Sequence, residues 1–475
     1  MSDGRVLFAA SEVFPFAKSG GLADVGYSLP RALAGTFDVT VVLPLYRFID
    51  RKAHKIKKRK ETFTVTLGED EHTVRLYECR YEGGIYFFVY TPLLCDRDYL
   101  YGPADEGYPD NAQRFALYSH AIVRLTKIFQ SDIVHLNDWQ TALAALLIAD
   151  DASLAAKTVY TIHNLAYQGI FEKSSLPQLG IGKEHFTPGG IEFYGKLNFM
   201  KAGIGYADAV TTVSPTYAQE ILTPEFGCGL EGYLQFHGAR LTGIANGIDT
   251  EHFSPGTDSA LLRPYKTPKG KRFNKMRYLE AAGLAADERP LLIFIGRFTW
   301  QKGMDLLMEA LPVMASHPCS IAILGEGESK YRDGIERAAA GLENVHLVFG
   351  YDEALAHRMY AAADFLLMPS LFEPCGLNQL IAMHYGAIPV VHRVGGLADT
   401  VKPLEICGQG GCGISFAAPT TEAFLGAFDE ALALYADGKH FRSITAQNMK
   451  ADVSWQRSAE AYAGVYRKIS KGAVE

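Results

Sequence analysis

The chain has 475 residues, of which 48% are hydrophobic and 21% charged, a composition typical of a packed globular protein and not of a disordered one. This length exceeds what one hydrophobic core usually serves, so we expect two domains. The formal net charge of -7 argues against a nucleic-acid partner, and no stretch is long and apolar enough to span a bilayer, so we expect no membrane partner either.

The amino terminus and the cysteines bear on the cellular compartment. An apolar run of strand length, residues 6–10, begins almost at once and is followed by no cleavage site, so no signal peptide is expected. The seven cysteines are an odd number without CxxC spacing, which is typical of reduced thiols and not of a disulfide framework or a zinc site. These features predict a cytoplasmic protein.

Short apolar runs alternate with helical patterns along the first half of the chain. Nearly continuous apolar strands are typical of a parallel sheet with helices on both faces. Residues 62–90 instead alternate in polarity, which predicts an antiparallel insertion, and the basic run 51–60 is interpreted as a solvated excursion. The predicted strands are 5–10, 39–43, 132–136, 158–162 and 209–213, and the predicted helices are 22–33, 111–129, 141–149 and 196–206.

The same alternation restarts in the second half. Two successive βαβ series imply an α/β protein with two doubly wound, Rossmann-like domains that face each other across a cleft. We expect one domain over residues 1–240 and a second over 241–455, and the last helix, within 456–475, can belong to either. The predicted strands are 291–295, 320–324, 346–349, 365–368 and 388–391, and the predicted helices are 304–314, 331–339, 353–362 and 378–385.

The loop Lys18-Ser19-Gly20-Gly21-Leu22 follows the first strand and leads into a helix. Ligands of open parallel sheets bind just beyond the carboxyl ends of the strands. Glycines at Gly20 and Gly21 let the backbone approach a phosphate, the helix N-terminus attracts negative charge, and Lys18 adds a cation. The alternative is a plain βα turn with an exposed lysine, because loops with two glycines are common.

Two strands of the second domain also end in candidate site residues. Arg297 and Lys302 flank the turn after residues 291–295, where they can clamp a diphosphate and stabilise it as it leaves. Glu373 follows the strand at 365–368, and a fixed carboxylate there can hold sugar hydroxyls or offset charge at an anomeric carbon. The alternatives are solvated surface cations and a helix-start glutamate favoured by the helix dipole.

Two strands of the first domain end in polar residues, Asp138 and His163, which we expect to face the cleft. An ordinary N-cap or turn residue is the alternative for each. Two further motifs are discounted: Asp96-Arg97-Asp98 matches the DxD pattern of metal-dependent glycosyltransferases but reads as solvated charge, and Gly325-Glu326-Gly327 is a lone GxG.

Taken together, these blocks resemble those of bacterial glycogen synthases and plant starch synthases. The segment from Lys18 to Val25 resembles the family's opening KTGGLADV loop, and the segment from Thr161 to Gly169 is similar to its central block. The segments from Arg297 to Gly303 and from Glu373 to Leu377 look like its two second-domain signatures. Four blocks in the right order, covering nearly the whole chain, are specific where no single block is.

The resemblance implies a GT-B fold, a retaining glucosyl transfer without a metal or other cofactor, ADP-glucose as the usual donor, and an α-1,4-glucan such as glycogen as the acceptor. It makes the first domain the acceptor domain and the second the nucleotide-sugar domain. Ser19, Gly296, Phe298 and Asn378 depart from the residues usual in the family, but none of these departures removes a charged group. The implied roles are Lys18, Gly20 and Gly21 at the donor; Arg297 and Lys302 on its phosphates; Glu373 and the backbone of Cys375, Gly376 and Leu377 at the glucose; His163 and Asp138 nearby; Asn246 on sugar; and Tyr351 by the adenine.

Retention of configuration usually uses a carboxylate nucleophile about 5 Å from an acid. The sequence offers no convincing second carboxylate for such a pair, which favours same-face attack in which the departing phosphate accepts the proton of the acceptor. Two alternatives stay open: a GT-B transferase that uses a different nucleotide sugar, and a non-catalytic glucan-binding protein.

Overall fold

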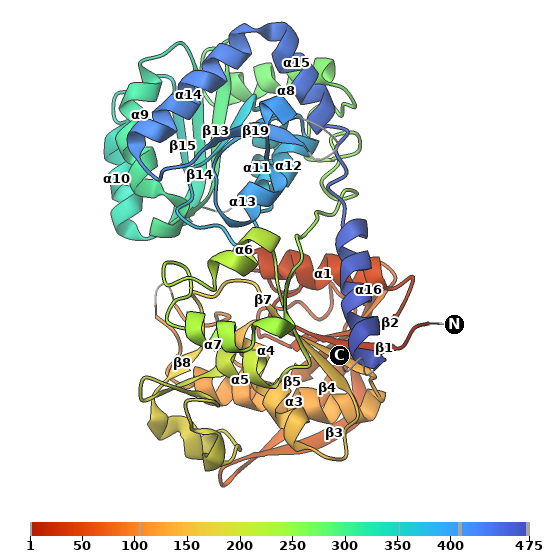
Figure 1. The fold of residues 1–475 in the computed structure, drawn as a ribbon. Coiled ribbons are helices and arrows are strands. Elements are labelled where there is room, and N and C mark those ends of the chain that lie inside the picture. The colour runs from red at the N-terminus through yellow and green to blue at the C-terminus, as the bar shows by residue number, and fades with distance from the viewer. Residues whose placement is uncertain (1, 104–105, 351, 407–410, 472–475) are drawn as a thin grey trace. The chain divides into compact units, whose positions relative to one another are not determined.

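The computed structural model describes residues 2–103, 106–350, 352–406 and 411–471, and the chain forms two compact units. Unit 1 contains Met1–Val213, Ala218–Ile244 and Trp455–Glu475, and unit 2 contains Ser214–Tyr217 and Ala245–Ser454 (Figure 1). The chain passes from unit 1 to the main part of unit 2 between Ile244 and Ala245, a few residues after the expected boundary at 240. The short segment Ser214–Tyr217 belongs to unit 2 although its sequence neighbours belong to unit 1, because Ser214 and Thr216 bind Asp399 of that unit.

Unit 1 is built on a nine-stranded sheet with the order β12-β11-β7-β6-β1-β2-β5-β4-β3. The central strands are parallel, and the expected antiparallel insertion is present as β3 and β4. The last strand of that insertion, β5, pairs parallel with β2, so the insertion extends the main sheet. The strands are β1 Arg5–Ala9, β2 Asp38–Pro44, β3 Lys57–Leu67, β4 Asp70–Tyr81, β5 Gly84–Tyr90, β6 Ile133–Asn137, β7 Lys157–Ile162, β11 Ala209–Thr212 and β12 Leu241–Gly243.

Two predictions for unit 1 are corrected. The basic run 51–60 is not wholly an excursion, since its last residues begin β3, where Arg59 pairs with Glu61 and Glu78. The helix predicted at 196–206 begins only at Phe199, because the preceding residues form β10 (Lys196–Asn198) of a small antiparallel sheet with β8 (Ile170–Phe171) and β9 (Glu192–Phe193). The Asn198 side chain then accepts the backbone N–H of Lys201, at 3.2 Å, and caps the helix.

The helices of unit 1 include one that comes from the far end of the chain. In α16 (Gln456–Ser470), Tyr462 and Tyr466 are fully buried, and the Tyr466 hydroxyl lies 2.6 Å from Nδ1 of the buried His135 in β6. The other helices that belong to this unit alone are α1 Gly21–Leu33, α2 Pro92–Cys95, α3 Asn111–Phe129, α4 Trp139–Asp150, α5 Phe199–Tyr206 and α7 Glu231–Phe236, while α6 Pro215–Glu220 spans a unit boundary.

Unit 2 is built on a seven-stranded parallel sheet with the order β15-β14-β13-β16-β17-β19-β18. Two strands run further than predicted, so that Arg297 and the Gly325-Glu326-Gly327 motif lie within paired strands and not in the loops after them. The strands are β13 Leu291–Phe298, β14 Ser320–Gly327, β15 Val345–Phe349, β16 Phe365–Met368, β17 Ile388–His392, β18 Lys402–Pro403 and β19 Cys412–Phe416.

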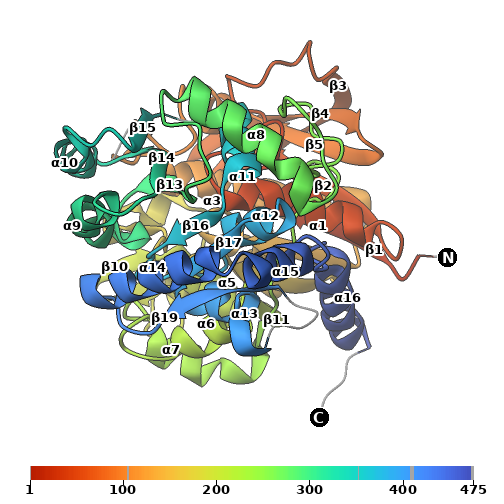
Figure 2. The same cartoon turned by 90° about the horizontal axis from the view of Figure 1, so that it is seen from above.

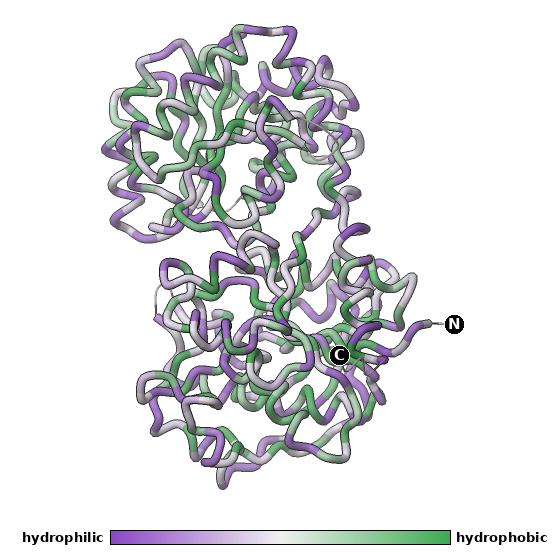
Figure 3. The backbone as a smooth tube through the Cα atoms, in the orientation of Figure 1, coloured by the Kyte–Doolittle hydropathy of each residue, from purple (hydrophilic) through white to green (hydrophobic). Residues whose placement is uncertain are grey.

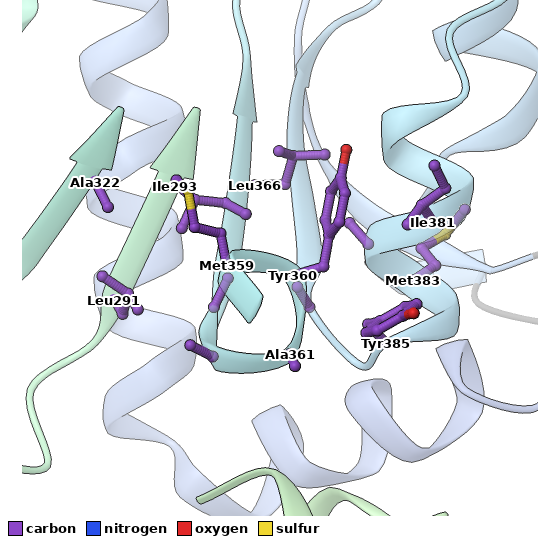
Figure 4. Packing of buried hydrophobic residues seen from close by; sticks show 14 of the residues in the cluster. Leu291, Ile293, Ala322, Met359, Tyr360, Ala361, Leu366, Ile381, Met383 and Tyr385 are labelled. Carbon is purple, nitrogen blue, oxygen red and sulfur yellow. The ribbon is translucent and has the colours of Figure 1, made fainter. Parts of the chain in front are cut away.

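Alternate residues of this sheet face two separate cores. Leu291 and Ile293 pack in one core, with α8, α11 and α12, and the intervening Leu292 and Phe294 pack in the other, with α9, α10 and α14. Successive side chains of a strand point to opposite faces, so a continuous apolar strand buries both. Figure 4 shows part of the first core, and Figure 3 shows hydrophobic stretches running through the interior of each unit.

The helices of unit 2 are α8 Pro268–Ala281, α9 Met304–Ala315, α10 Ser329–Ala339, α11 Glu353–Ala362, α12 Asn378–His384, α13 Gly395–Thr400, α14 Thr421–Ala436 and α15 Gly438–Asn448. The last two follow one another across β17 and β19 (Figure 2). Four of these helices, α8, α13, α14 and α15, are not among the predicted ones. Within α8 the buried positions include Lys271 and Lys275, so the helix lacks the apolar stripe by which helices are recognised.

The described helices and cysteines bear on two further expectations. Across the described ranges, every helix is too short or too polar to cross a membrane. The expectation of reduced thiols throughout is wrong for Cys412, which is disulfide-bonded, whereas Cys79, Cys95, Cys228, Cys319 and Cys375 are free.

Candidate active site

In each unit, several of the predicted site residues follow the strands at which the order of the sheet reverses. In unit 1, β2 lies on one side of β1 and β6 on the other; in unit 2, β14 and β16 flank β13 in the same way. Ligands of open α/β sheets bind at the carboxyl ends of the strands at such a reversal. The Lys18 loop follows β1, Asp138 follows β6, and Glu373 follows β16.

The Lys18 loop surrounds a carboxylate of its own chain. The backbone N–H groups of Ser19 and Gly20 donate to Glu12 Oε2, at 2.5 and 3.2 Å, and the Ser19 hydroxyl donates to Oε1 at 2.7 Å. Glu12 is buried and also accepts the Tyr101 hydroxyl, at 2.6 Å. Two of the amides expected to cradle a phosphate therefore already hold an anion.

Lys18 itself lies beside this cradle. Its Nζ is 2.8 Å from Asp24 Oδ1 and 5.5 Å from the centre of the Phe14 ring. The exposed fraction of the Lys18 side chain is 25%. Gly20 and Gly21 are exposed, and a Cβ at Gly20 would meet nothing within 4 Å. The packing of the protein itself therefore does not require a glycine at position 20. Glu12, which holds this loop, was missing from the predictions, although its place just after β1 was a usable signal.

Asp138 does not act as the N-cap that its position suggests. It precedes α4 with φ +54, and its side chain makes no capping hydrogen bond. Its Oδ1 instead accepts the backbone N–H of His163, at 2.8 Å, from the loop after the neighbouring strand β7. Burial raises the pKa of Asp138 to about 7, against the lowering effect of hydrogen bonds from the backbone of His163 and Asn164.

The His163 ring is held in one tautomer. Its Nε2 lies 2.9 Å from Asn137 Oδ1, and the amide nitrogen of Asn137 donates to Ala9 O, so the oxygen faces the imidazole and Nε2 carries the proton. Burial lowers the pKa of His163 to about 3, so the ring is neutral at physiological pH. A neutral imidazole there offers hydrogen bonds and not a positive charge.

In unit 2, Lys302 and Glu373 form an ion pair. Lys302 Nζ lies 2.6 Å from Glu373 Oε2, and the Ser370 hydroxyl donates to the same oxygen at 3.0 Å. The pair joins the turn after β13 to the loop after β16, across 71 residues of sequence. A cation predicted for phosphate and a carboxylate predicted for sugar are therefore side by side.

A glycine fixes the turn that carries Lys302. Gly303 has φ +68, and a Cβ there would lie 2.0 Å from Pro369 O, so only glycine allows this approach of the two backbones. The contact is reinforced by the Leu371 N–H, which donates to Gln301 O at 2.9 Å. The backbone thus sets the distance between the Lys302 turn and the Glu373 loop.

The segment after Glu373 is buried at first and becomes partly exposed at Gly376 and Leu377. Cys375 is buried, burial raises the pKa of its thiol to about 12, and Asn246 donates backbone and side-chain hydrogen bonds to it. Gly376 has φ +70, and Leu377 precedes α12. Asn246 Oδ1 is buried and has no hydrogen-bond partner among the described residues, so it can accept a hydroxyl of a bound sugar.

Two further predicted site residues are Arg297 and Tyr351. Arg297 is exposed near the end of β13, where its register partner in β14 is Glu326. Tyr351 lies outside the described residues. Of the discounted acidic pair, Asp96 accepts the Tyr90 hydroxyl and Asp98 pairs with Arg47 at 3.3 Å, so both carboxylates bind protein groups.

Known protein families match both halves of the chain. Residues 5–236 match the family model of the starch synthase catalytic domain, and residues 279–448 match that of glycosyl transferases group 1. The chain is 40% identical to glycogen synthase 2 of Geobacter sulfurreducens, with 98% of each chain covered. It is 43% identical to a glycogen synthase of Anaeromyxobacter sp., with 98% of this chain and 99% of the relative covered.

Solved structures agree with these relatives. The catalytic domain of starch synthase IV from Arabidopsis thaliana, bound to ADP and acarbose, has a TM-score of 0.92 and 32% identity, over 99% of this chain and 100% of that one. Sucrose-phosphate synthase from Thermosynechococcus elongatus, at 17% identity and a TM-score of 0.64, shares the fold alone. The two Rossmann-like sheets are those of a GT-B glycosyltransferase, and the chain belongs to the family of glycogen and starch synthases.

Proposed function

We propose that this chain transfers glucose from ADP-glucose to the non-reducing 4-hydroxyl of an α-1,4-glucan such as glycogen, with retention of configuration. The observation that carries this proposal is the ion pair of Lys302 and Glu373. The pair lies where the strand order of the sheet in unit 2 reverses, and α/β sheets bind their ligands at such a reversal. The Arabidopsis starch synthase IV structure holds ADP, the nucleotide that ADP-glucose releases, which favours adenine as the base of the donor.

The reaction exchanges one bond at the anomeric carbon. The bond from C1 to the β-phosphate oxygen breaks and leaves its electron pair on ADP, while the acceptor O4 bonds to C1 from the same face. The O4 proton passes to the departing phosphate oxygen. Arg297 and Lys302 stabilise the charge that develops on that phosphate, in the place that a metal ion takes in other transferases.

The state of Glu373 supports same-face attack. A covalent intermediate would require a carboxylate oxygen free to attack C1. Lys302 and Ser370 both bind Glu373 Oε2, and the lysine compensates the charge of the carboxylate, which suits a group that accepts sugar hydroxyls better than a nucleophile. We assign Asn246 Oδ1 to a sugar hydroxyl on the same grounds, because it is a buried acceptor in need of a donor.

The residues of unit 1 have supporting roles in this proposal. Lys18 contributes a cation toward the donor, and His163, neutral and fixed through Asn137, offers hydrogen bonds to sugar. Asp138 positions His163 by accepting its backbone N–H. We also propose a cytoplasmic location, since nucleotide-sugar donors are made in the cytoplasm.

The test is glucose incorporation by the purified chain from ADP-, UDP- and GDP-glucose, each with and without glycogen, followed by digestion of the product with α-amylase. We expect ADP-glucose with glycogen to give the fastest incorporation, into an α-amylase-sensitive product. Preference for another nucleotide would indicate a transferase with a different donor. Glycogen binding without any turnover would indicate a non-catalytic binding protein.

A further inference from the structure

Three side chains of unit 2 converge outside the candidate active site. Glu353 and His357 lie four residues apart in α11, a spacing that places both on one face of the helix, and His252 approaches from the segment that follows Asn246. One potential ligand atom from each of the three lies within 4.8 Å of the others. His252 Nε2 and Glu353 Oε1 are 3.5 Å apart.

The His357 ring is oriented by a buried carboxylate. Its Nδ1 lies 2.8 Å from Asp258 Oδ2, and because a carboxylate only accepts, Nδ1 carries a proton, so that in the neutral ring Nε2 has the lone pair. Asp258 is fixed in turn by the hydroxyl of Tyr385, at 2.5 Å. A carboxylate behind a histidine, setting its tautomer and orientation, is the usual support of a metal-binding imidazole.

Among the described residues, no hydrogen-bond donor contacts the lone pair of His357 Nε2. Only 6% of this side chain is exposed. Burying an acceptor without a partner costs free energy of folding. A cation bound at Nε2 would remove this cost, and the adjacent imidazole and carboxylate can complete its ligand set.

We propose that His252, Glu353 and His357 bind one divalent ion of the zinc class. Two imidazoles and one carboxylate, with water in the fourth position, form a common zinc ligand set. Tetrahedral zinc, with ligands about 2.0–2.1 Å away, separates its ligand atoms by about 3.4 Å, close to the distance from His252 to Glu353. The hard cations Mg²⁺ and Ca²⁺ prefer sets of oxygen ligands.

The bound ion would tie two parts of unit 2 together. It joins α11 to the segment that leads from Asn246 to His252, and Asn246 in turn binds Cys375 beside Glu373. The ion thereby stabilises the fold around the predicted sugar-binding residues without contacting the donor. This role is independent of the proposed reaction, whose leaving group is stabilised by Arg297 and Lys302.

The proposal is tested on the full chain after removal of metals by chelation and dialysis. Calorimetric titration with Zn²⁺ should give one ion per chain, and zinc at about 100 times its dissociation constant should raise the unfolding midpoint of unit 2 by about 5 °C. Titration with Mg²⁺ or Ca²⁺ should give neither effect. A chain that binds no zinc would overturn the proposal.

Variants at the two partly exposed ligands avoid disruption of the buried network. H252A and E353Q should each lower zinc affinity at least tenfold and abolish the thermal shift. H440A, at an exposed histidine of α15, is the matched control and should bind zinc like the parent. Unchanged affinity and stoichiometry in H252A and E353Q would place the zinc elsewhere and overturn the assignment.

Discussion

Lys302 and Glu373 form a largely buried ion pair that joins two loops of unit 2, and both residues also have roles in the proposed reaction. Only 19% of the lysine side chain and 7% of the glutamate side chain are exposed, so each charge depends on the other for compensation. Removal of one partner of a buried pair is strongly destabilising, whereas replacement of both partners by uncharged groups is often neutral. Stability and turnover should therefore respond differently to single and double changes.

K302M should destabilise unit 2 by about 3 kcal/mol, toward the lower end of the range for buried pairs because the lysine is partly exposed, and should abolish most turnover. The double variant K302M/E373Q should recover most of this stability but none of the turnover. Chemical denaturation and initial rates of glucose incorporation measure the two effects. If the double variant is as unstable as K302M, the pair is not what links these two loops.

Arg297 offers the opposite case, because its side chain is exposed. R297A should lower kcat by about 100- to 1,000-fold, the usual effect of removing one group that stabilises transition-state charge, and change the free energy of unfolding by less than about 0.5 kcal/mol. R442A, at an exposed arginine of α15, serves as control. Near-parental kcat in R297A would refute its role at the phosphate.

At the scale of elements, the ends of β13 and β16 are joined by backbone contact. Gly303 ends the turn after β13 in a left-handed conformation and lies against the carbonyl of Pro369, beyond β16. This contact holds the Lys302 turn to the Glu373 loop before any side chain is considered. A side chain at Gly303 would disturb both the conformation and the contact.

G303A should therefore destabilise unit 2 much more than G283A does. Both glycines have similar φ, +68 and +71, but a Cβ at 283 meets nothing within 4 Å. G283A should cost about 1 kcal/mol, the penalty for the left-handed conformation alone, with turnover unchanged. G303A should cost at least twice as much and lower turnover. Equal losses in the two variants would mean that the Pro369 contact is unimportant.

The sequence predicted most elements because their signals are local. Residues 111–129, 353–362 and 365–368 match α3, α11 and β16 to the residue, since apolar positions at helical spacing mark the two helices and a continuous apolar run marks the strand. The helix α8 escaped prediction because it buries lysines, and Lys271 Nζ donates to the carbonyls of Tyr360 and Tyr385, far away in sequence. The Glu353-x3-His357 spacing was visible, but nothing local pointed to His252 or Asp258 as its partners.

For the whole molecule, the return of α16 to unit 1 is the main long-range feature. The Tyr466 hydroxyl contacts Nδ1 of His135, and Thr161 contacts Nε2 at 2.6 Å, so the imidazole is enclosed between α16 and the sheet. Burial lowers the pKa of His135 to about 3, with a smaller contribution from His163. The ring is thus neutral in the folded protein.

This burial predicts a pH dependence of stability. Below the unfolded pKa of about 6.5, the unfolded chain binds a proton at His135 that the folded chain does not bind until pH approaches 3. Stability should fall as pH decreases across that window, by up to about 1.4 kcal/mol per pH unit for this histidine. Denaturation of unit 1, followed by the fluorescence of Trp139 and Trp455, measures the slope.

H135Q should reduce the slope of stability against pH by the contribution of one titrating histidine. It should also lower the free energy of unfolding at pH 7.5, because the buried contacts of His135 are lost. H72Q, at a partly exposed histidine of β4, is the control and should keep the parental slope. An unchanged slope in H135Q would show that His135 does not carry the pH dependence.

The sequence by itself determined the class of fold, the approximate positions of most parallel strands and four motif blocks, because apolar periodicity and glycine-rich turns are local properties of the chain. Only the tertiary structure decided that Glu12 fills the Lys18 loop, that Lys302 pairs with Glu373, and that α16 rejoins unit 1. These contacts join residues far apart in sequence. Their partners are selected by strand order and by the need to satisfy buried charge, which no local pattern encodes.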